Sequence, residues 1–163
     1  MKDLLDKLRK PIAAITISGA LVTGVANHEG FRSEAYRPLP QDVYTIGFGT
    51  TKHEDGSSIK PGERITREQA DLYLRNDLRL FVKQISNCIK VPITEYEFNS
   101  YVSLSYNIGS SAFCNSTLVK QLNQGNYDMA CDEILKWNKF KGKELQGLTN
   151  RRKQEYKECK NQD

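Results

Sequence analysis

Apolar residues recur at helical spacing along much of the chain from residue 66 onward. Thr66 and Gln69 have the spacing of a capping box, and the apolar side chains after them repeat every three or four residues, on one face of a helix. These apolar side chains are Ala70, Leu74, Leu78, Phe81, Val82 and Ile85. The pattern predicts an amphipathic helix that begins directly after Thr66.

Further helix starts and stops follow in the same part of the chain. Thr94 and Glu97 repeat the capping-box spacing and predict a second helix, with Phe98, Tyr101, Val102 and Tyr106 on its apolar face. Ser116 is expected to cap a third helix, which ends at Gly125. Two more apolar stretches predict helices over residues 130–137 and 150–159.

Residues 31–64 have a different character, because Gly and Pro interrupt them repeatedly. Between these breaks, residues 43–49 (VYTIGFG) are rich in β-branched and aromatic side chains, which favours a small sheet built from hairpins. The uncharged residues 11–28 before this region predict one further helix. We therefore expect an α+β fold: one helix, a small β lobe and a larger helical lobe.

The length of 163 residues suits a single folded domain with a sizeable core. We expect three parts within it: residues 1–28 as an N-terminal segment and first helix, residues 29–65 as the β lobe, and residues 66–163 as the helical lobe. A cleft between two unequal lobes is a natural place for an extended polymer.

The formal net charge is +4, but the basic residues are spread along the sequence. Arg151, Arg152 and Lys153 form one short cluster. A nucleic-acid-binding protein usually concentrates its Lys and Arg on one face with aromatic residues between them, so we expect no nucleic-acid partner. A mild positive charge also suits an enzyme that approaches an anionic polymer.

The four cysteines are Cys88, Cys114, Cys131 and Cys159, and none belongs to a CxxC pair. With only two histidines in the chain, zinc-ligand spacing is missing, and we expect no metal or other cofactor. Two readings of the cysteines stay open at this point. They form two disulfides in an oxidising compartment, or they are buried free thiols in a cytosolic protein.

Glu29 is the first candidate for chemistry. It follows the uncharged stretch, precedes Gly30, which is expected to end the helix, and has Phe31 beside it. Cleavage of a glycosidic bond needs a carboxylic acid that protonates the leaving oxygen, and apolar surroundings keep such an acid protonated near neutral pH. A single Glu at a helix end is more commonly just solvated, so position alone does not decide its role.

The N-terminal segment has the pattern of an export signal, because a basic cluster at residues 7–10 precedes the uncharged residues 11–28. Four readings are weighed: a cleaved signal peptide, a permanent membrane anchor, a buried amphipathic helix, and a temporary membrane anchor. Cleavage after Ala26 would leave Glu29 three residues from a new terminus. A permanent anchor would need a more apolar segment, since Ser, Thr, Gly and Ala dilute this one. We favour the temporary anchor.

Several motifs together resemble the phage lysozymes of glycoside hydrolase family 24. They are residues 28–32 (HEGFR), 35–37 (AYR), 44–50 (YTIGFGT), 107–109 (NIG) with Phe113, 116–118 (STL), and Gly147-Leu148 followed by Arg151-Arg152. The resemblance covers residues 28–160 and implies a lysozyme-like fold with a cleft between its lobes. The paired Glu-Gly and Tyr-Thr-Ile-Gly-x-Gly motifs are specific at this spacing, whereas each alone would be weak.

The resemblance assigns roles residue by residue. Glu29 matches the family's general acid, and Thr45 matches the threonine that positions water beside the attacked sugar carbon. The family's acidic residue does not transfer cleanly, because its slot falls near Pro38. Asp42 is the nearest carboxylate and the candidate for that role. The sequence equally allows Asp42 to be a turn residue without a catalytic role. Arg151 resembles the arginine that pairs with the catalytic Glu, and Arg152 is the alternative.

Other positions follow from the same resemblance. Tyr36 and Asn107 lie in the matched motifs and are candidates for binding or orienting substrate. The resemblance pairs Cys131 with Cys159, which leaves Cys88 with Cys114. It also implies a signal-anchor-release segment at residues 11–26, exported uncleaved, tethered to the inner membrane, and freed into the periplasm when the membrane depolarises. Release would complete the helix beneath Glu29.

The implied function is that of an endolysin: hydrolysis of the β-1,4 bond between N-acetylmuramic acid and N-acetylglucosamine in bacterial peptidoglycan, with lysis of the host. Two alternatives stay open, a lytic transglycosylase and a non-catalytic wall-binding or membrane-tethered protein. A metalloprotease is disfavoured, because His28-Glu29 lacks the second His of the HExxH motif. We expect a monomer.

Overall fold

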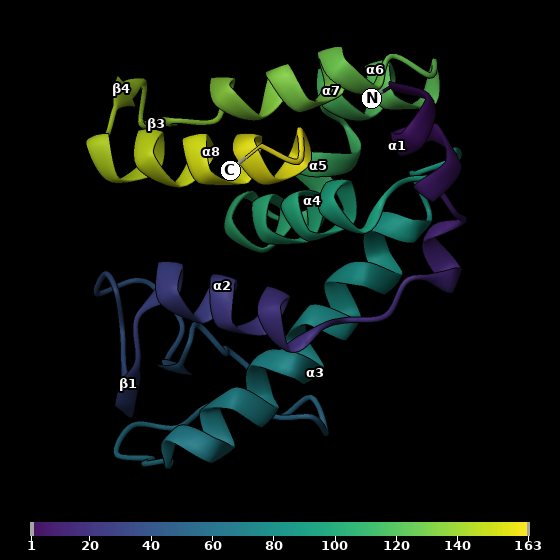
Figure 1. The fold of residues 1–163 in the computed structure, drawn as a ribbon. Helices are drawn as coiled ribbons and strands as arrows, with labels where there is room; N and C mark the ends of the chain where they lie inside the picture. The colour runs from purple at the N-terminus through teal and green to yellow at the C-terminus, as the bar shows by residue number, and fades with distance from the viewer. Residues whose placement is uncertain (1, 163) are drawn as a thin grey trace. The chain divides into compact units, whose positions relative to one another are not determined.

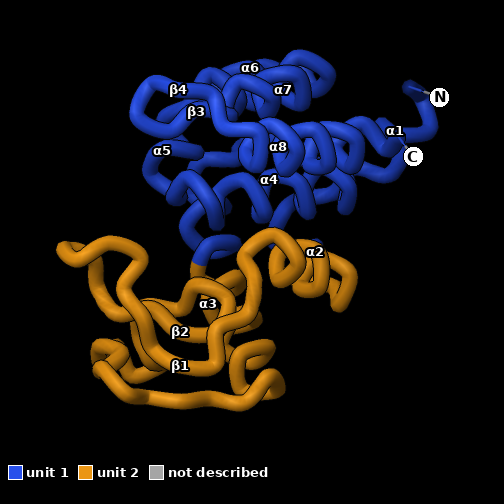
Figure 2. The backbone as a smooth tube through the Cα atoms, turned by 90° about the vertical axis from the view of Figure 1, so that its left-hand side faces the viewer, with its two compact units in different colours: residues 1–16, 81–163 blue, residues 17–80 orange. Residues whose placement is uncertain are grey.

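The computed structural model describes residues 2–162 and divides into two compact units (Figures 1 and 2). Unit 2 is Ile17–Leu80, and unit 1 combines the residues up to Thr16 with those from Phe81 onward. Helix α3, Arg67–Ser86, passes from unit 2 into unit 1. The first residues thus group with the helices after residue 80. The division into parts 1–28, 29–65 and 66–163 stays a prediction.

Unit 2 is built around helix α2, Gly19–Glu29, and an antiparallel pair of strands, β1 (Arg32–Tyr36) and β2 (Thr45–Gly47). Tyr36 lies opposite Thr45, and the register shifts between the two paired ends. Isolated bridges join Ile46 to Thr50 and Lys52 to Ser58, so the Gly-rich and Pro-rich region forms hairpins. The small hairpin sheet that the sequence predicts is confirmed.

The N-terminal region departs from the single helix expected over residues 11–28. Pro11 precedes a 3-10 turn, η1 (Ile12–Ala14), and the chain is then extended until Ser18. The Ser18 hydroxyl accepts a hydrogen bond from Leu21 N at 3.1 Å and so caps α2. This local cap starts the helix at Gly19. Among residues 2–162, no helix is long and apolar enough to cross a membrane.

Unit 1 is mostly helical, as predicted. Its helices after α3 are α4 (Glu95–Ile108), α5 (Ser110–Cys114), α6 (Thr117–Asn123), α7 (Tyr127–Glu133), η2 (Ile134–Lys136) and α8 (Gln146–Cys159). α8 packs along α4 (Figure 1), and the side of α4 that includes Phe98, Tyr101 and Val102 is fully buried. The capping boxes at Thr66 and Thr94 both form, which confirms the predicted starts of α3 and α4.

Four of the helices and strands of unit 1 were not predicted: α1 (Lys2–Leu8), α5, and the short strands β3 (Lys139–Phe140) and β4 (Lys143–Glu144). In addition, α8 begins at Gln146, whereas the sequence predicted a start at Asn150. No side chain caps α8, so its start carries no local sequence signal. The β3–β4 hairpin has only two residue pairs, too few for an alternating pattern.

Two disulfides cross-link unit 1, and they are the pairs that the resemblance implies. Cys88 joins Cys114, and Cys131 joins Cys159. Each closes a loop with a sequence separation of 26 or 28 residues, for which chain-entropy arguments give a stabilisation of about 3 kcal/mol. Free thiols, the alternative reading of the cysteines, are therefore wrong.

The turn that follows β2 depends on a glycine. Gly47 has a φ of +66°, and a Cβ built there would lie 3.1 Å from both Ala70 Cβ and Ile65 Cδ1. We expect Gly47→Ala to lower the free energy of unfolding by about 3 kcal/mol, since backbone strain and overpacking add. Urea denaturation measures this loss.

Gly56 provides the matched control, because it lies in the same unit at a φ of +85°, and a Cβ placed there would meet nothing within 4 Å. Gly56→Ala should cost about 1 kcal/mol, from strain alone. Equal losses for both variants would show that contact with α3 and Ile65 does not limit this position.

Candidate active site

Glu29 is the last residue of α2, and its side chain is partly buried. Gly30 ends the helix with a φ of +73°, and its N–H donates to Ala26 O at 3.1 Å. The conformation at Gly30 is one that other residues rarely adopt, so the helix ends directly after the carboxyl-bearing residue. The predicted position of Glu29 at a helix end is therefore realised.

An aromatic contact holds the chain just after Glu29. The Phe31 ring lies 5.6 Å from the ring of Phe48, which is 1% exposed. The Arg67 guanidinium from α3 sits over both rings, 5.6 Å and 4.9 Å from their centroids. Because Phe48 belongs to the turn after β2, this cluster joins the end of α2 to the hairpin.

Thr45 begins β2 and is 7% exposed. Its Oγ1 donates to Val43 O at 3.3 Å, which orients the hydroxyl. Tyr36, at the end of β1, pairs with Thr45 across the hairpin. Ile46, which follows Thr45 in β2, is fully buried. Glu29, Tyr36 and Thr45 therefore lie on consecutive elements of unit 2, three of the predicted site residues in one compact unit.

Asp42 lies in the turn between β1 and β2 and is partly buried. Its Oδ2 accepts a hydrogen bond from Leu39 N at 3.0 Å, and its own N–H donates to Leu39 O at 2.9 Å. These bonds are those of a turn residue. They occupy one carboxylate oxygen and fix the direction in which the other oxygen points.

A buried pair that sequence reasoning missed supports the same hairpin. Thr50, 2% exposed, donates its hydroxyl hydrogen to Asp77 Oδ2 on α3 at 2.6 Å. Burial raises the pKa of Asp77 to about 6, although the hydrogen bond from Thr50 lowers it. The two residues are 27 apart in the sequence, and no local pattern connects them.

Arg151, a predicted orienting residue, belongs to a buried polar cluster in unit 1. Its Nε donates to Glu155 Oε1 at 3.0 Å, and its Nη2 donates to Ser103 O at 3.1 Å. The Ser103 hydroxyl donates to the same Glu155 oxygen at 2.6 Å. Glu155 was not among the predicted site residues. The one sequence signal for its pairing with Arg151 is the spacing of four residues on a helix.

Arg152 completes this cluster and is 0% exposed. Its guanidinium lies 3.2 Å from Glu155 Oε2 and donates a hydrogen bond to the Asn107 side-chain oxygen. Asn107, predicted to bind or orient substrate, is therefore held by an arginine of α8. The structure brings Arg151, Arg152 and Asn107 together in one network.

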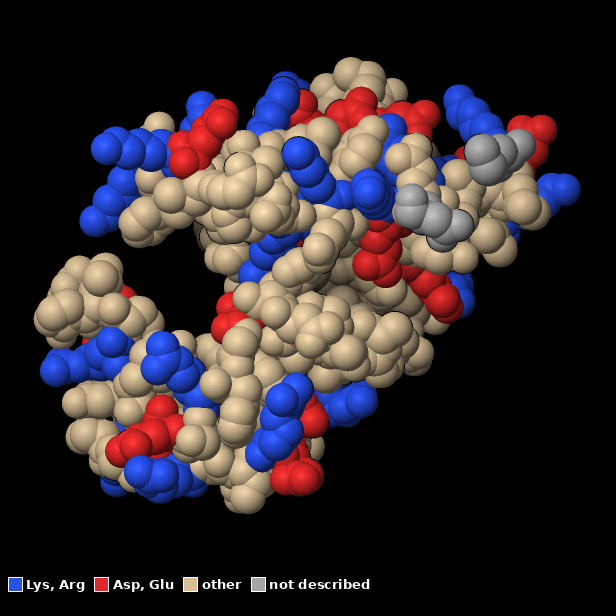
Figure 3. Space-filling view, turned by 60° about the vertical axis from the view of Figure 1, so that its left-hand side comes forward, with Lys and Arg blue, Asp and Glu red and all other residues tan. Residues whose placement is uncertain are grey.

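On the face shown in Figure 3, Lys and Arg side chains are interspersed with Asp and Glu and do not form one continuous patch. Among the described residues, no group of three His, Cys, Asp or Glu side chains is placed to hold a metal ion.

Solved structures identify the class of protein that this fold defines. The endolysin of Escherichia coli O157:H7 phage FAHEc1 matches with a TM-score of 0.78 and 37% identity, over 90% of this chain and 94% of that one. A P22 lysozyme mutant matches with the same TM-score and 36% identity, over 89% and 98% of the two chains. The α+β fold is thus confirmed as that of the phage lysozymes.

Sequence comparison gives the family. Residues 26–155 match the phage lysozyme family, and the chain belongs to it. It is 38% identical to the endolysin of Salmonella phage P22, over 85% of this chain and 94% of that protein. It is 34% identical to a protein of Enterobacteria phage P21 named SAR-endolysin, over 93% and 94% of the two.

Longer relatives also match. The endolysin of Bacillus phage B103 is 40% identical over 86% of this chain, but the match covers 52% of that protein. The chain therefore spans about half the length of the Bacillus phage relatives that it matches.

Asp77 should make stability depend on pH. Its pKa is about 6 in the folded state and about 3.9 in an unfolded chain, so between these values the folded state holds a proton that the unfolded state has lost. Stability should therefore fall as pH rises from about 4 to about 7. Relative to Asp77→Asn, which cannot ionise and still accepts from Thr50, the loss should approach about 3 kcal/mol.

Urea denaturation at several pH values measures this difference, and other titrating groups cancel between the two proteins. Thr50→Val is the partner variant. It removes the hydrogen bond that lowers the Asp77 pKa, so the fall in stability should extend to higher pH and become larger in total. Parallel profiles of stability against pH for the wild type and Asp77→Asn would contradict the raised pKa of Asp77.

Proposed function

We propose that the chain is a muramidase-type endolysin that hydrolyses the β-1,4 bond between N-acetylmuramic acid and N-acetylglucosamine in peptidoglycan and so lyses the host cell. The observation that carries the proposal is the position of Glu29. This residue ends α2 directly before the hairpin that carries Thr45, within the stretch that matches the phage lysozyme family. The endolysin names of the relatives support the same activity.

In the proposed mechanism Glu29 protonates the glycosidic oxygen as the bond breaks, and Thr45 positions the attacking water. The Glu29 carboxyl would be aimed by the turn at Gly30 and by the Phe31–Phe48 contact. The Thr45 hydroxyl is already directed by its bond to Val43 O. Both groups therefore belong to a small unit whose elements are tied together before substrate binds.

Asp42 is proposed as the second carboxylate, which stabilises the positive charge that develops on the sugar. Its Oδ2 closes the turn with Leu39 N, which leaves Oδ1 to act on substrate. Tyr36, Asn107 and Arg151 remain predictions for binding or orienting the glycan. The buried cluster around Glu155 supports the last two by restricting the motion of their side chains.

Two alternatives make different predictions. A lytic transglycosylase closes an anhydro sugar without water, so mass analysis of the products distinguishes it from a hydrolase. A wall-binding protein would leave glycan strands intact. Thr45 and a second carboxylate favour hydrolysis, because in this mechanism the threonine positions a water and the carboxylate stabilises positive charge.

We also propose that residues 11–26 attach the protein transiently to the inner membrane after export without cleavage, before release into the periplasm. The P21 relative named SAR-endolysin supports this, as does the weak apolar character of the segment. In the folded form, residues 19–26 are part of the helix that ends at Glu29. Release would therefore complete the support of the catalytic residue. We expect a monomer that does not bind nucleic acid.

Glu29→Gln should reduce the rate of fragment release from purified peptidoglycan at least about 100-fold, because an amide cannot donate the required proton. Glu34→Gln is the matched control in the adjoining strand. The Glu34 carboxylate forms an exposed ion pair with Arg64 at 2.8 Å, and its loss should change the rate less than about twofold. Equal rates for both variants would refute the assignment of Glu29 as the acid.

Asp42→Asn separates the two roles of Asp42. Asparagine can still accept the bond from Leu39 N, so the turn should persist, but the negative charge is lost. We expect the rate on peptidoglycan to fall about 100-fold with unchanged thermal stability. A rate within about threefold of the wild type would reduce Asp42 to a turn residue.

A further inference from the structure

The residues just before the proposed membrane segment are fastened to unit 1. Lys10 and Ile93 form an antiparallel bridge, with Lys10 N donating to Ile93 O at 3.0 Å and Ile93 N donating to Lys10 O at 2.9 Å. Beyond this bridge, Ile12 and Ile15 are 8% and 6% exposed. Apolar side chains that a bilayer would cover are here covered by protein.

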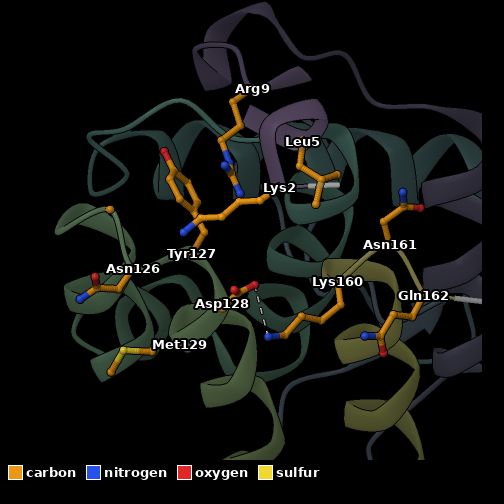
Figure 4. Close-up of a pocket in the computed structure, with 11 residues that line it drawn as sticks. Lys2, Leu5, Arg9, Asn126, Tyr127, Asp128, Met129, Lys160, Asn161 and Gln162 are labelled. Atoms are coloured by element: carbon orange, nitrogen blue, oxygen red, sulfur yellow. Dashed lines mark hydrogen bonds and ion pairs between the residues drawn. The ribbon is translucent and has the colours of Figure 1, made fainter. Parts of the chain in front are cut away.

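Arg9 makes the most extensive side-chain contacts in this segment, and its side chain is 9% exposed. Its Nη2 donates to Glu97 Oε1 at 2.8 Å, and its Nε lies 3.3 Å from the same oxygen. The guanidinium carbon lies 3.4 Å from the centroid of the Tyr127 ring, which it faces in Figure 4. Burial lowers the pKa of Arg9, but the hydrogen bond and charge of Glu97, together with Tyr127 and Asp6, outweigh burial and raise it.

Both walls of the Arg9 site are held by bonds that do not involve the N-terminal segment. Glu97 Oε2 accepts from Thr94 N at 2.8 Å within the capping box, which fixes the carboxylate. Tyr127 Oη donates to Pro92 O at 2.7 Å, which fixes the ring. The site is therefore a preformed receptor for a planar cation, with a carboxylate for paired hydrogen bonds and an aromatic face for stacking.

Neighbouring basic side chains make no comparable contacts. Lys7 is exposed, and in the ion pair of Lys10 with Glu95, at 3.3 Å, the side chains are 44% and 67% exposed. Exposed pairs of this kind contribute little to stability, whereas a buried, stacked and doubly hydrogen-bonded guanidinium is specific. Arg9 is thus the anchoring residue of residues 2–10.

We propose that the Glu97–Tyr127 site is a docking site that captures Arg9 when residues 11–26 leave the membrane, and so holds the protein in its released form. The inference rests on the membrane attachment proposed above. While residues 11–26 span a bilayer, Ile12 and Ile15 face lipid and the Lys10–Ile93 bridge cannot form. The docked and spanning states are therefore mutually exclusive, and docking shifts the balance between them toward release.

The test follows the full chain in bacteria, before and after an ionophore collapses the membrane potential, by separating membrane and soluble fractions. Arg9→Met should lower the ratio of released to membrane-bound protein about tenfold, and Arg9→Lys, which keeps the charge, should lower it by a smaller factor. Lys7→Met is the matched control. It removes one positive charge from the same flank but no docking contact, so its release should follow the wild type.

Hydrogen exchange on the purified soluble protein reports docking directly. The amides of Lys10 and Ile93 should exchange about tenfold faster in Arg9→Met than in the wild type, and at wild-type rates in Lys7→Met. Glu97→Gln should have a similar effect, and adding Arg9→Met to it should change release little further, because the two side chains act as a pair. Full additivity would contradict the pairing.

The outcomes are distinguishable. Equal release of Arg9→Met and Lys7→Met, with faster exchange only in Arg9→Met, would show that docking is structural and does not control release, and the inference would be wrong. Wild-type protein that is soluble before the ionophore is added would refute the membrane attachment itself, and the inference with it. Retention of Arg9→Met together with release of Lys7→Met would support both.

Discussion

The contact between Phe31 and Phe48 is the interaction on which unit 2 depends, because it connects the end of a helix to the turn of a hairpin. Between the two rings the chain runs through β1, the turn at Asp42 and β2. Fixing both ends of this path also fixes the strand pairing of Tyr36 with Thr45. Arg67 stacks over both rings and extends the contact to α3. This packing supports the two elements that carry the proposed acid and the proposed water-positioning hydroxyl.

Local signals were sufficient for much of the fold. Both capping boxes are complete within four residues of sequence, so Thr66 and Thr94 could be assigned as helix starts. Glu29 could be placed at a helix end because Gly30 follows it. By contrast, the break before Ser18 was missed, since Ser also occurs within helices and nothing local distinguishes the two cases. The early start of α8 has no side-chain cap at all.

The parts of the site that were missed are held by contacts between residues far apart in the sequence. Thr50 and Asp77 meet across 27 residues, and Ser103 reaches Glu155 across 52. Such pairs have no period and no spacing rule, so they appear only when the chain is folded. Buried charges of this kind contribute little net stability, but removing one partner is costly. They therefore disfavour other folded conformations in which the partners would be separated. The specific roles of Glu29 and Thr45 came from family resemblance, because position alone would also allow a solvated helix end.

Unlike the other interactions of the structure, the two disulfides form only in an oxidising environment. Both close loops within unit 1, whereas unit 2, which carries Glu29 and Thr45, contains no cysteine. In a reducing cytosol unit 1 would lack about 3 kcal/mol from each bridge, while unit 2 would lose nothing directly. In a newly made chain unit 1 would then be less stable for as long as it stays in a reducing compartment. If the chain is exported as proposed, oxidation in the periplasm would stabilise unit 1 only after it has left the cytosol.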